Sequence, residues 1–171
     1  MAERSYLRDG RAPVPKDART SALMSRIRSK DTAPERALRR LLAAAGVRGY
    51  RLNHRNTPGR PDVTFVGRKV AVFVHGCFWH GHDCPMFHWP QSREEFWRAK
   101  IGRNRERDAE TWTAARASGW RCGTVWECAL KGKGRLPPGQ VIDSLACWLS
   151  SDADKFCIEG QWIDNAAYPP A

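Results

Sequence analysis

The residues best suited to chemistry lie in one stretch of the chain, residues 74–84 (VHGCFWHGHDC). This stretch holds three of the five histidines and two of the six cysteines among 171 residues. Thiolate and imidazole groups are the ligands that a tetrahedral zinc ion prefers. Cys77, His82 and Cys84 supply three of them in a C-x4-H-x-C spacing, so the stretch predicts a loop held by zinc.

A structural zinc site needs a fourth ligand. Cys128 follows the end of a predicted strand, whereas Cys122 lies within that strand. A residue just past a strand end can reach a neighbouring loop more easily than one held in the sheet. We therefore favour Cys128 over Cys122 as the fourth ligand.

A second centre is predicted around Asp62, which opens an apolar strand, an unusual place for a carboxylate without a task. A hairpin would bring it beside the next strand, which ends at His75. A carboxylate near a strand-end carbonyl oxygen suits magnesium, which beside a phosphodiester stabilises developing charge and activates water. His75 and His80 are candidates to move a proton or to donate to a phosphate near neutral pH.

Two further carboxylates have structural explanations beside functional ones. Asp108 lies on a predicted long helix, where it fits either a solvated surface residue or a group that orients one imidazole. Glu35 completes a capping box with Thr32. Only its nearness to a basic segment makes Glu35 a functional candidate as well.

Aromatic residues next to a basic surface can enter between bases and unstack them. Phe78 and Trp79 lie inside the predicted zinc loop, and Trp97 lies near the start of the long helix. We predict that these three form a wedge. Core packing is the prediction for Trp112, Trp120, Trp126 and Trp148.

The elements that must position these groups follow from periodicity and turn signals. Their order predicts an α/β fold in a single domain, with a central mixed sheet flanked by helices. Residues 1–18 are predicted to be a flexible basic arm, and residues 151–171 a weakly patterned tail. The predicted helices are 32–46, 94–118 and 141–149, and the predicted strands are 50–54, 62–66, 69–74 and 120–126.

The charge points to a polyanionic partner. Lys and Arg total 29 against 18 Asp and Glu, and residues 111–171 hold six of each sign, so the whole excess lies in residues 1–110. Nucleic acid is the partner expected for such an Arg-rich surface. With no apolar run near the ~20 residues of a membrane span and no signal-peptide pattern, we expect a cytoplasmic protein whose cysteines are thiols or metal ligands.

Five motifs resemble the very short patch repair (Vsr) DNA mismatch endonucleases, and the resemblance covers residues 19–149. The combination of HGCFWH with a downstream WEC is especially specific. The motifs are DTAPE (31–35), PGRPD (58–62), VHGCFWHGHDC (74–84), EFWRAKIGRNRERD (95–108) and VWECALKG (125–132).

The resemblance implies a restriction-endonuclease-like fold over residues 19–150. It implies a magnesium-dependent enzyme that nicks one strand 5′ of the thymine in a T:G mismatch. Such mismatches arise when 5-methylcytosine deaminates, so the implied partners are mismatched double-stranded DNA, a DNA cytosine methyltransferase and mismatch-repair proteins. A monomer in the bacterial cytoplasm, near the nucleoid, is expected, since one asymmetric lesion needs no two-fold dimer.

The resemblance also implies residue roles. Asp62 would bind magnesium together with the main-chain carbonyl of Val74. His75 and His80 would act on the water and the scissile phosphate, with Asp108 paired to His80 and Glu35 in the outer shell. The zinc would be held by Cys77, His82, Cys84 and Cys128, and the wedge would consist of Phe78, Trp79, Trp97 and Met24.

Two alternatives stay open from the sequence. One is a restriction-like endonuclease that cuts a matched DNA target. The other is a zinc-stabilised DNA-binding module without catalysis, which the presence of Asp62, His75 and His80 disfavours. One departure from the wider fold family is that His75 stands where that family carries a lysine.

Overall fold

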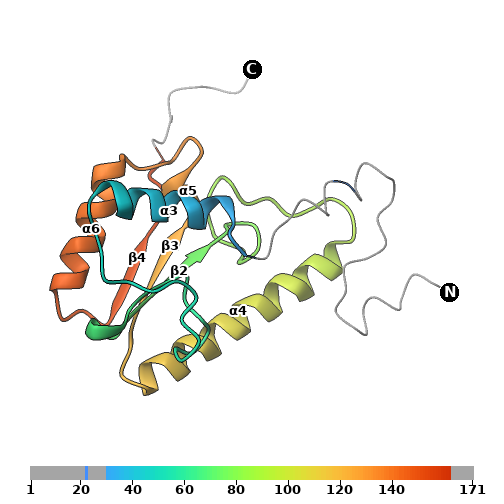
Figure 1. Ribbon diagram of the computed structural model, residues 1–171. Helices are drawn as coiled ribbons and strands as arrows, with labels where there is room; N and C mark the ends of the chain where they lie inside the picture. The colour runs from blue at the N-terminus through green and yellow to red at the C-terminus, as the bar shows by residue number, and fades with distance from the viewer. Residues whose placement is uncertain (1–21, 23–29, 163–171) are drawn as a thin grey trace.

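The computed structural model describes residue 22 and residues 30–162, and its centre is a four-stranded sheet (Figure 1). The strand order is β1-β2-β3-β4. β1 and β2 form an antiparallel hairpin, whereas β2, β3 and β4 run parallel. The mixed sheet predicted from the sequence is confirmed. The strands are β1 (Val63–Phe65), β2 (Val70–His75), β3 (Arg121–Trp126) and β4 (Lys155–Ile158).

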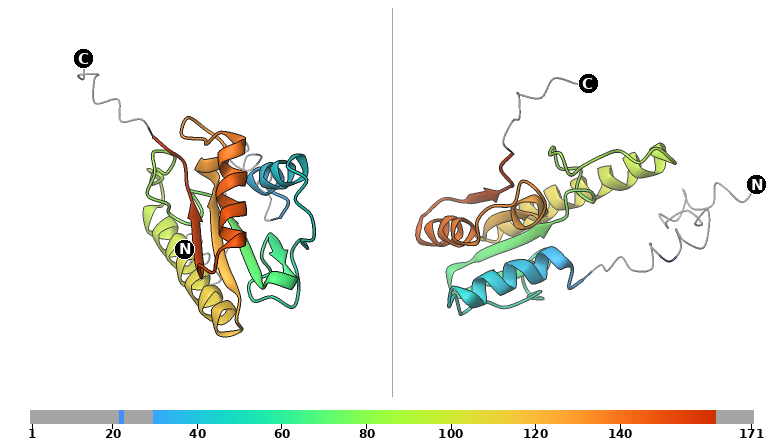
Figure 2. Two further views of the ribbon diagram at one scale, coloured as in Figure 1. Left: turned by 90° about the vertical axis from the view of Figure 1, so that its left-hand side faces the viewer. Right: turned by 90° about the horizontal axis from the view of Figure 1, so that it is seen from above.

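Helices cover both faces of the sheet, as the two views of Figure 2 show. On one face, α3 (Ala33–Ala44) and α6 (Pro138–Ser150) bury Leu38, Leu42 and Leu145 against the strands. On the other face lies α4 (Glu94–Ala117), whose Ala115 packs on a smaller cluster. Two short elements complete the set: the 3-10 turn η2 (Val66–Arg68) and α5 (Glu127–Leu130).

Alternation along β2 decides where its last residues point. Val70 and Val72 pack in the core on the α3–α6 side, whereas Ala71 and Phe73 pack on the α4 side. Because side chains alternate along a strand, His75 continues the row that faces α4. The strand thus delivers His75 toward the long helix and passes the chain directly into the histidine- and cysteine-rich loop.

The start of α3 confirms the capping box. Thr32 Oγ1 accepts the backbone N–H of Glu35 at 3.4 Å, and Thr32 Oγ1 donates to the Glu35 carboxylate at 2.8 Å. The other carboxylate oxygen of Glu35 accepts the N–H of Asp31 at 2.9 Å. Glu35 is thus fixed at the helix start, which holds it in one place for any further role.

The long helix α4 buries few of its 24 residues, chiefly Phe96, Ile101, Asn104 and Ala115. Its N-terminal half extends past the sheet beside the loop that precedes it (Figure 1). This projecting part carries Trp97, so one end of α4 is available to shape a surface beside the sheet edge.

Two predictions about strands were wrong. The predicted strand 50–54 is reduced to an isolated bridge between Arg51 and Thr64, because only that pair meets β1. In the opposite direction, β4 was not predicted: it falls within residues 151–171, where the sequence shows little pattern. β4 is a strand of only four residues at the sheet edge, and two of them are exposed, so it is too short to give the apolar pattern that reveals a strand.

The predicted arm 1–18 and the wedge candidate Met24 lie outside the described residues. Among the residues that the model describes, no helix combines the length and the apolar character needed to cross a membrane.

Candidate active site and metal centre

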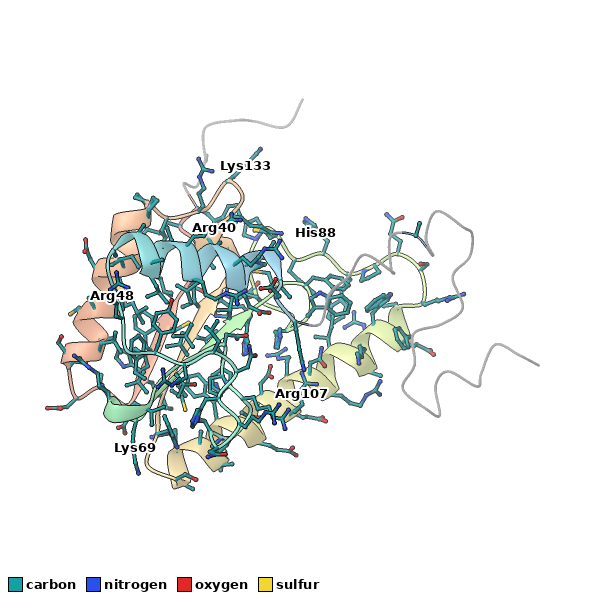
Figure 3. The ribbon with its side chains drawn as sticks, viewed as in Figure 1. Arg40, Arg48, Lys69, His88, Arg107 and Lys133 are labelled. Carbon is teal, nitrogen blue, oxygen red and sulfur yellow. The ribbon has the colours of Figure 1, made fainter. Side chains whose placement is uncertain are left out.

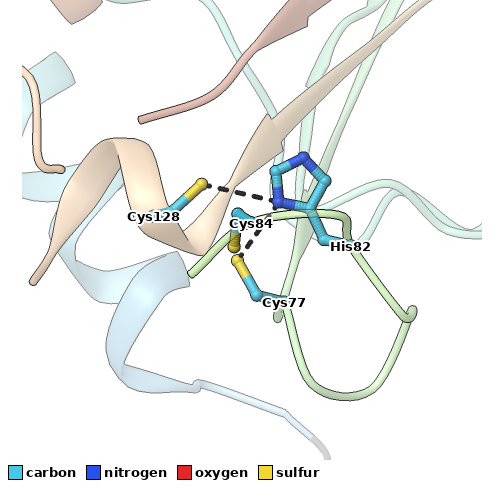
Figure 4. Close-up of side chains that lie close together, drawn as sticks. All are labelled: Cys77, His82, Cys84 and Cys128. Atoms are coloured by element: carbon cyan, nitrogen blue, oxygen red, sulfur yellow. Dashed lines mark hydrogen bonds between the residues drawn. The ribbon is translucent and has the colours of Figure 1, made fainter. Parts of the chain in front are cut away.

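The loop after β2 and the start of α5 bring four soft ligands together (Figure 4). One ligand atom from each of Cys77, His82, Cys84 and Cys128 lies within 4.8 Å of the others. Cys77 and Cys128 are buried, and His82 is only 9% exposed. The predicted ligand set is therefore assembled in space, including the preference for Cys128.

The distances fit a tetrahedral zinc ion. The Nδ1 atom of His82 lies 3.6 Å from the Sγ atoms of both Cys77 and Cys128. With Zn–S and Zn–N bonds of ~2.3 and ~2.0 Å, a tetrahedral site places sulfur and nitrogen roughly 3.6 Å apart. The buried Cys3His cluster is thus consistent with a structural zinc site.

Cys122 has a different environment. It is fully buried in the smaller core cluster between β3 and α4, and burial raises the pKa of its thiol to about 11. Burial also raises the pKa values of the Cys77 and Cys128 thiols. A bound cation would supply the charge that allows these two thiols to lose their protons despite burial.

Asp62 lies against the edge of β2 in the hairpin. Its Oδ2 accepts the backbone N–H of Val74 at 2.7 Å. Burial and the nearby Glu35 carboxylate together raise the pKa of Asp62 to about 6, although the hydrogen bond from Val74 and the charge of Arg39 act against them. An oxygen ligand that is poorly solvated and beside a second carboxylate is a suitable place for a hard cation.

His75, at the end of β2, and His80, in the loop that follows, stack on one another beside α4. The rings of His75 and His80 are 3.9 Å apart and 5° from parallel. Nδ1 of His80 forms a short hydrogen bond with Oδ2 of Asp108. Asp108 is therefore a partner of an imidazole rather than a free surface carboxylate, as the resemblance implied.

Burial keeps His75 neutral. Burial and the adjacent His80 together lower the pKa of His75 to about 3, although the carboxylate of Asp108 acts in the opposite direction. Its ring also meets Trp126 edge-on at 5.3 Å between centroids. The neutral imidazole has a free lone pair that can accept a proton, and a negative phosphate nearby would raise its pKa toward the range of a general base.

The predicted wedge residues form one aromatic cluster at the projecting end of α4. Phe78 contacts Trp79 and Trp97 edge-on, with centroids 5.2 and 5.1 Å apart. Trp79 and Trp97 lie 5.9 Å apart. All three are half-buried, so each ring is supported by its neighbours while keeping an exposed part.

Apart from Trp97 and Asp108, the candidate catalytic and wedge residues described above line one open groove of about 1090 Å³. Asp62, His75 and His80 line it, as do Phe78 and Trp79. Arg107, labelled on α4 in Figure 3, is one of its cations, whereas the labelled Arg40, Arg48, Lys69 and Lys133 lie elsewhere on the surface. The groove cations are Lys30, Arg55, Arg60, Lys100, Arg107 and Lys131.

The structure adds supporting residues that the sequence did not reveal. Glu127, half-buried beside the ligand Cys128, accepts the N–H of Cys77 at 3.0 Å and pairs with Lys131 at 2.5 Å. Asn104, 7% exposed, donates to the carbonyl of Trp79 at 2.8 Å. Both contacts join segments far apart in the chain, so no local pattern signals them; the one sequence cue is an acid next to a candidate metal ligand.

Comparison with known proteins gives a consistent result. A family model described as "DNA mismatch endonuclease Vsr" matches residues 13–86. The protein named "DNA mismatch endonuclease Vsr" from Escherichia coli (strain K12) is 38% identical over 152 residues, which cover 89% of this chain and 97% of that protein.

Two other relatives carry a different name. The "type II nicking enzyme V.XorIIP" of Xanthomonas oryzae pv. oryzae is 47% identical over 114 residues, 67% of this chain and 83% of that protein. The "type II nicking enzyme V.NmeAIP" of Neisseria meningitidis is 42% identical over 116 residues, 68% and 82% of the two chains.

Proposed function

The chain belongs to the Vsr family of DNA nicking endonucleases, and on that premise we propose that it nicks DNA 5′ of the thymine in a T:G mismatch. Such a mismatch is the product of 5-methylcytosine deamination, so the cut would begin very short patch repair. Family membership decides against a DNA-binding module without catalysis. The observation that carries the proposal is one groove in which a hydrolytic set lies beside an aromatic cluster.

The magnesium site of the proposal consists of Asp62 and the main-chain carbonyl of Val74. The donor set supports it: the carboxyl group of Asp62 is desolvated and lies next to the carboxylate of Glu35, and its pKa stays raised although the charge of Arg39 acts against the shift. Magnesium at this point would stabilise the developing charge on the phosphate and favour ionisation of the attacking water. Glu35, fixed by its capping bonds, would act from the outer shell.

The two histidines would have different roles in proton transfer. His75 is neutral in the free protein and would take a proton from the attacking water once the negative phosphate beside it raises its pKa. His80 keeps its Nδ1 on Asp108, which leaves Nε2 to donate to an oxygen of the scissile phosphate. Asp108 orients that ring and stabilises its protonated form, the role that a carboxylate plays behind a catalytic imidazole.

The aromatic cluster supports the mismatch part of the proposal. Phe78, Trp79 and Trp97 brace one another, so an entering ring would not collapse into the protein. Inserting a side chain between base pairs costs roughly a few kcal/mol of stacking energy. This cost is smallest where the base pairing is already weak. A T:G pair is such a place. Met24 would complete the wedge and lies outside the described residues.

The remaining parts of the proposal concern binding and context. The groove cations would hold the phosphate backbone. Zinc on Cys77, His82, Cys84 and Cys128 would hold the loop that carries Phe78 to His80. We also propose a monomer in the bacterial cytoplasm that works with a DNA cytosine methyltransferase and with mismatch-repair proteins.

A second candidate function is nicking at a matched recognition sequence. It is favoured by the names of the Xanthomonas and Neisseria relatives, which call them type II nicking enzymes. The aromatic cluster favours the mismatch instead, since a matched duplex resists insertion more strongly.

The test is strand-specific nicking of end-labelled duplexes that differ only in a T:G or a C:G pair, over a panel of flanking sequences. Each duplex is incubated with magnesium and without any added divalent cation. We expect a magnesium-dependent nick 5′ of the mismatched thymine and an intact C:G duplex. Equal cutting of both duplexes would establish the matched-target function and overturn the mismatch one.

A further inference from the structure

The segment that follows β4 contacts the Cys3His cluster from outside. Oε2 of Glu159 lies 2.7 Å from Nε2 of His82. The backbone N–H of Gly160 donates to Sγ of Cys128 at 3.2 Å. Two consecutive residues thus contact two of the four ligands, from a part of the chain where the sequence showed no pattern.

Sheet register explains why these two residues arrive there. β4 runs parallel to β3, and Ile158 is the partner of Val125. Glu159 therefore follows beside the end of β3, and Gly160 beside the start of α5, which carries Cys128. A side chain on Gly160 would not fit, because its Cβ would lie 2.6 Å from the carbonyl oxygen of Cys128 and 2.7 Å from that of Gly134.

The two nitrogens of His82 have distinct surroundings. Nδ1 faces the sulfurs of Cys77 and Cys128, each at 3.6 Å, so Nδ1 is the metal-facing atom. Nε2 then carries the hydrogen and donates it to Glu159. A carboxylate on the outer nitrogen of a ligand histidine fixes the tautomer, orients the ring and makes it a stronger ligand.

The ring of His82 has a second restraint. It stacks on Trp126 with centroids 3.9 Å apart and planes 15° from parallel. Trp126 limits tilting of the ring, and Glu159 limits its rotation within the plane of the stack. The Glu159 side chain is 59% exposed, so water competes for the hydrogen bond and its effect belongs at the weaker end for such contacts.

We propose that Glu159 is a positioning residue of the metal centre, and that the segment after β4 fastens that centre by holding His82 and Cys128. The inference rests on the proposed zinc site and not on the mismatch specificity. It assigns a role to the C-terminal part of the described chain that the motif residues do not supply.

The experiment measures zinc release from the full-length chain to a chromogenic chelator, with the zinc content of each preparation determined first. Glu159→Ala is compared with the wild type, with Glu159→Gln and with Asp152→Ala. Asp152 is exposed in the stretch that precedes β4, so its substitution removes an equal charge without touching the cluster.

We expect Glu159→Ala to release zinc about tenfold faster than the wild type. This is the lower end of the roughly 10–100-fold loss of metal affinity that follows substitution of a residue bonded to a metal ligand, because Glu159 is exposed. Glu159→Gln keeps an acceptor oxygen, so its rate of zinc release is expected to lie between those of the wild type and Glu159→Ala. Asp152→Ala is expected to release zinc at the wild-type rate. Cobalt-substituted protein adds a spectroscopic check, since a loosened imidazole changes the visible absorption bands of the tetrahedral ion.

Release from both Glu159 variants at the wild-type rate would overturn the role of Glu159, and so would equal acceleration by Asp152→Ala. If Glu159→Ala does not fold, the comparison of Glu159→Gln with Asp152→Ala decides. Wild-type protein without zinc would remove the site itself. Wild-type protein that holds zinc but cuts no T:G duplex would overturn the proposed function and leave this inference standing.

Discussion

The end of β2 supplies two centres of opposite character, only two residues apart. Cys77 enters a closed cluster in which protein atoms offer all four ligands, two of them fully or almost fully buried. His75 and Asp62 line an open groove, where the carboxylate oxygens of Asp62 would hold the proposed magnesium ion and leave room for water and substrate. A closed set of soft ligands suits a structural ion, and an open set with hard oxygen suits catalysis.

Burial also has different consequences in the two centres. In the cluster, burial opposes ionisation of the Cys77 and Cys128 thiols, and a bound cation would offset that effect. In the groove, burial raises the pKa of Asp62 and lowers the pKa of His75. Both groups therefore favour their neutral forms, and a bound cation would help Asp62 to ionise. The comparison supports a structural role for the closed centre and the proposed catalytic role for the open one.

The largest effect is expected from Cys128→Ser, which removes a ligand of the closed centre. The free energy of unfolding should fall by about 5 kcal/mol, a part of the roughly 10–16 kcal/mol that zinc contributes to small zinc fingers. Nicking should be lost as well, since the loop carrying His80 loses its anchor. Chemical denaturation and zinc content measure the effect, with the exposed Cys147→Ser as the control. Full stability without zinc would contradict a structural role for the cluster.

Asp62→Asn should separate the two centres most clearly. Nicking is expected to fall about 10³-fold, or roughly 4 kcal/mol in the barrier, because the cation loses its ligand. Zinc content should not change. Quenched nicking assays on the T:G duplex measure the loss, and a variant that cuts at the wild-type rate would exclude Asp62 from the reaction.

Asp62→Asn should also change how the stability of the protein depends on pH. Without magnesium, folded Asp62 keeps its proton up to about pH 6, whereas the unfolded chain releases it near 3.8. The folded state therefore binds more protons between these values, and stability falls as the pH rises through them. Asp62→Asn should remove this fall and stabilise the protein at pH 7 by about 1–3 kcal/mol. Denaturation of both proteins at pH 4.5 and 7 tests the sign; a less stable variant at pH 7 would contradict it.

Asp108→Asn should have a smaller effect, because it acts through His80. We expect nicking to fall about 10²-fold, the lower range for a general acid or base. The double substitution with His80→Ala should be no worse than His80→Ala alone, since the carboxylate works only through that ring. Additive losses in this cycle would mean that Asp108 has a separate task.

Trp79→Ala should have the smallest effect on the reaction and the greatest dependence on the substrate. Loss of a stacking surface worth about 1–3 kcal/mol per base predicts roughly a tenfold or greater loss of affinity for the T:G duplex. Trp79→Phe should retain most of the binding. Fluorescence anisotropy with T:G and C:G duplexes measures the difference, and an equal loss on both would remove Trp79 from mismatch recognition.

Much of the site was predictable from short segments of sequence. Cys77, His82 and Cys84 predict a metal-binding loop because all three ligands lie within eight consecutive residues. The capping box at Thr32 and Glu35 and the unbroken apolar strand that ends at His75 are likewise local, and local patterns decide local structure. The motifs also identified the family.

The tertiary structure decided what depends on chain segments meeting. It replaced the predicted strand 50–54 with a single bridge at Arg51, and it paired His80 with Asp108 across 28 residues. The β3–β4 register placed Glu159 on His82, 77 residues away. Ligand types and spacing are properties of a segment, but these contacts depend on sheet register and helix packing, which short, exposed or charged segments do not encode in their own sequence.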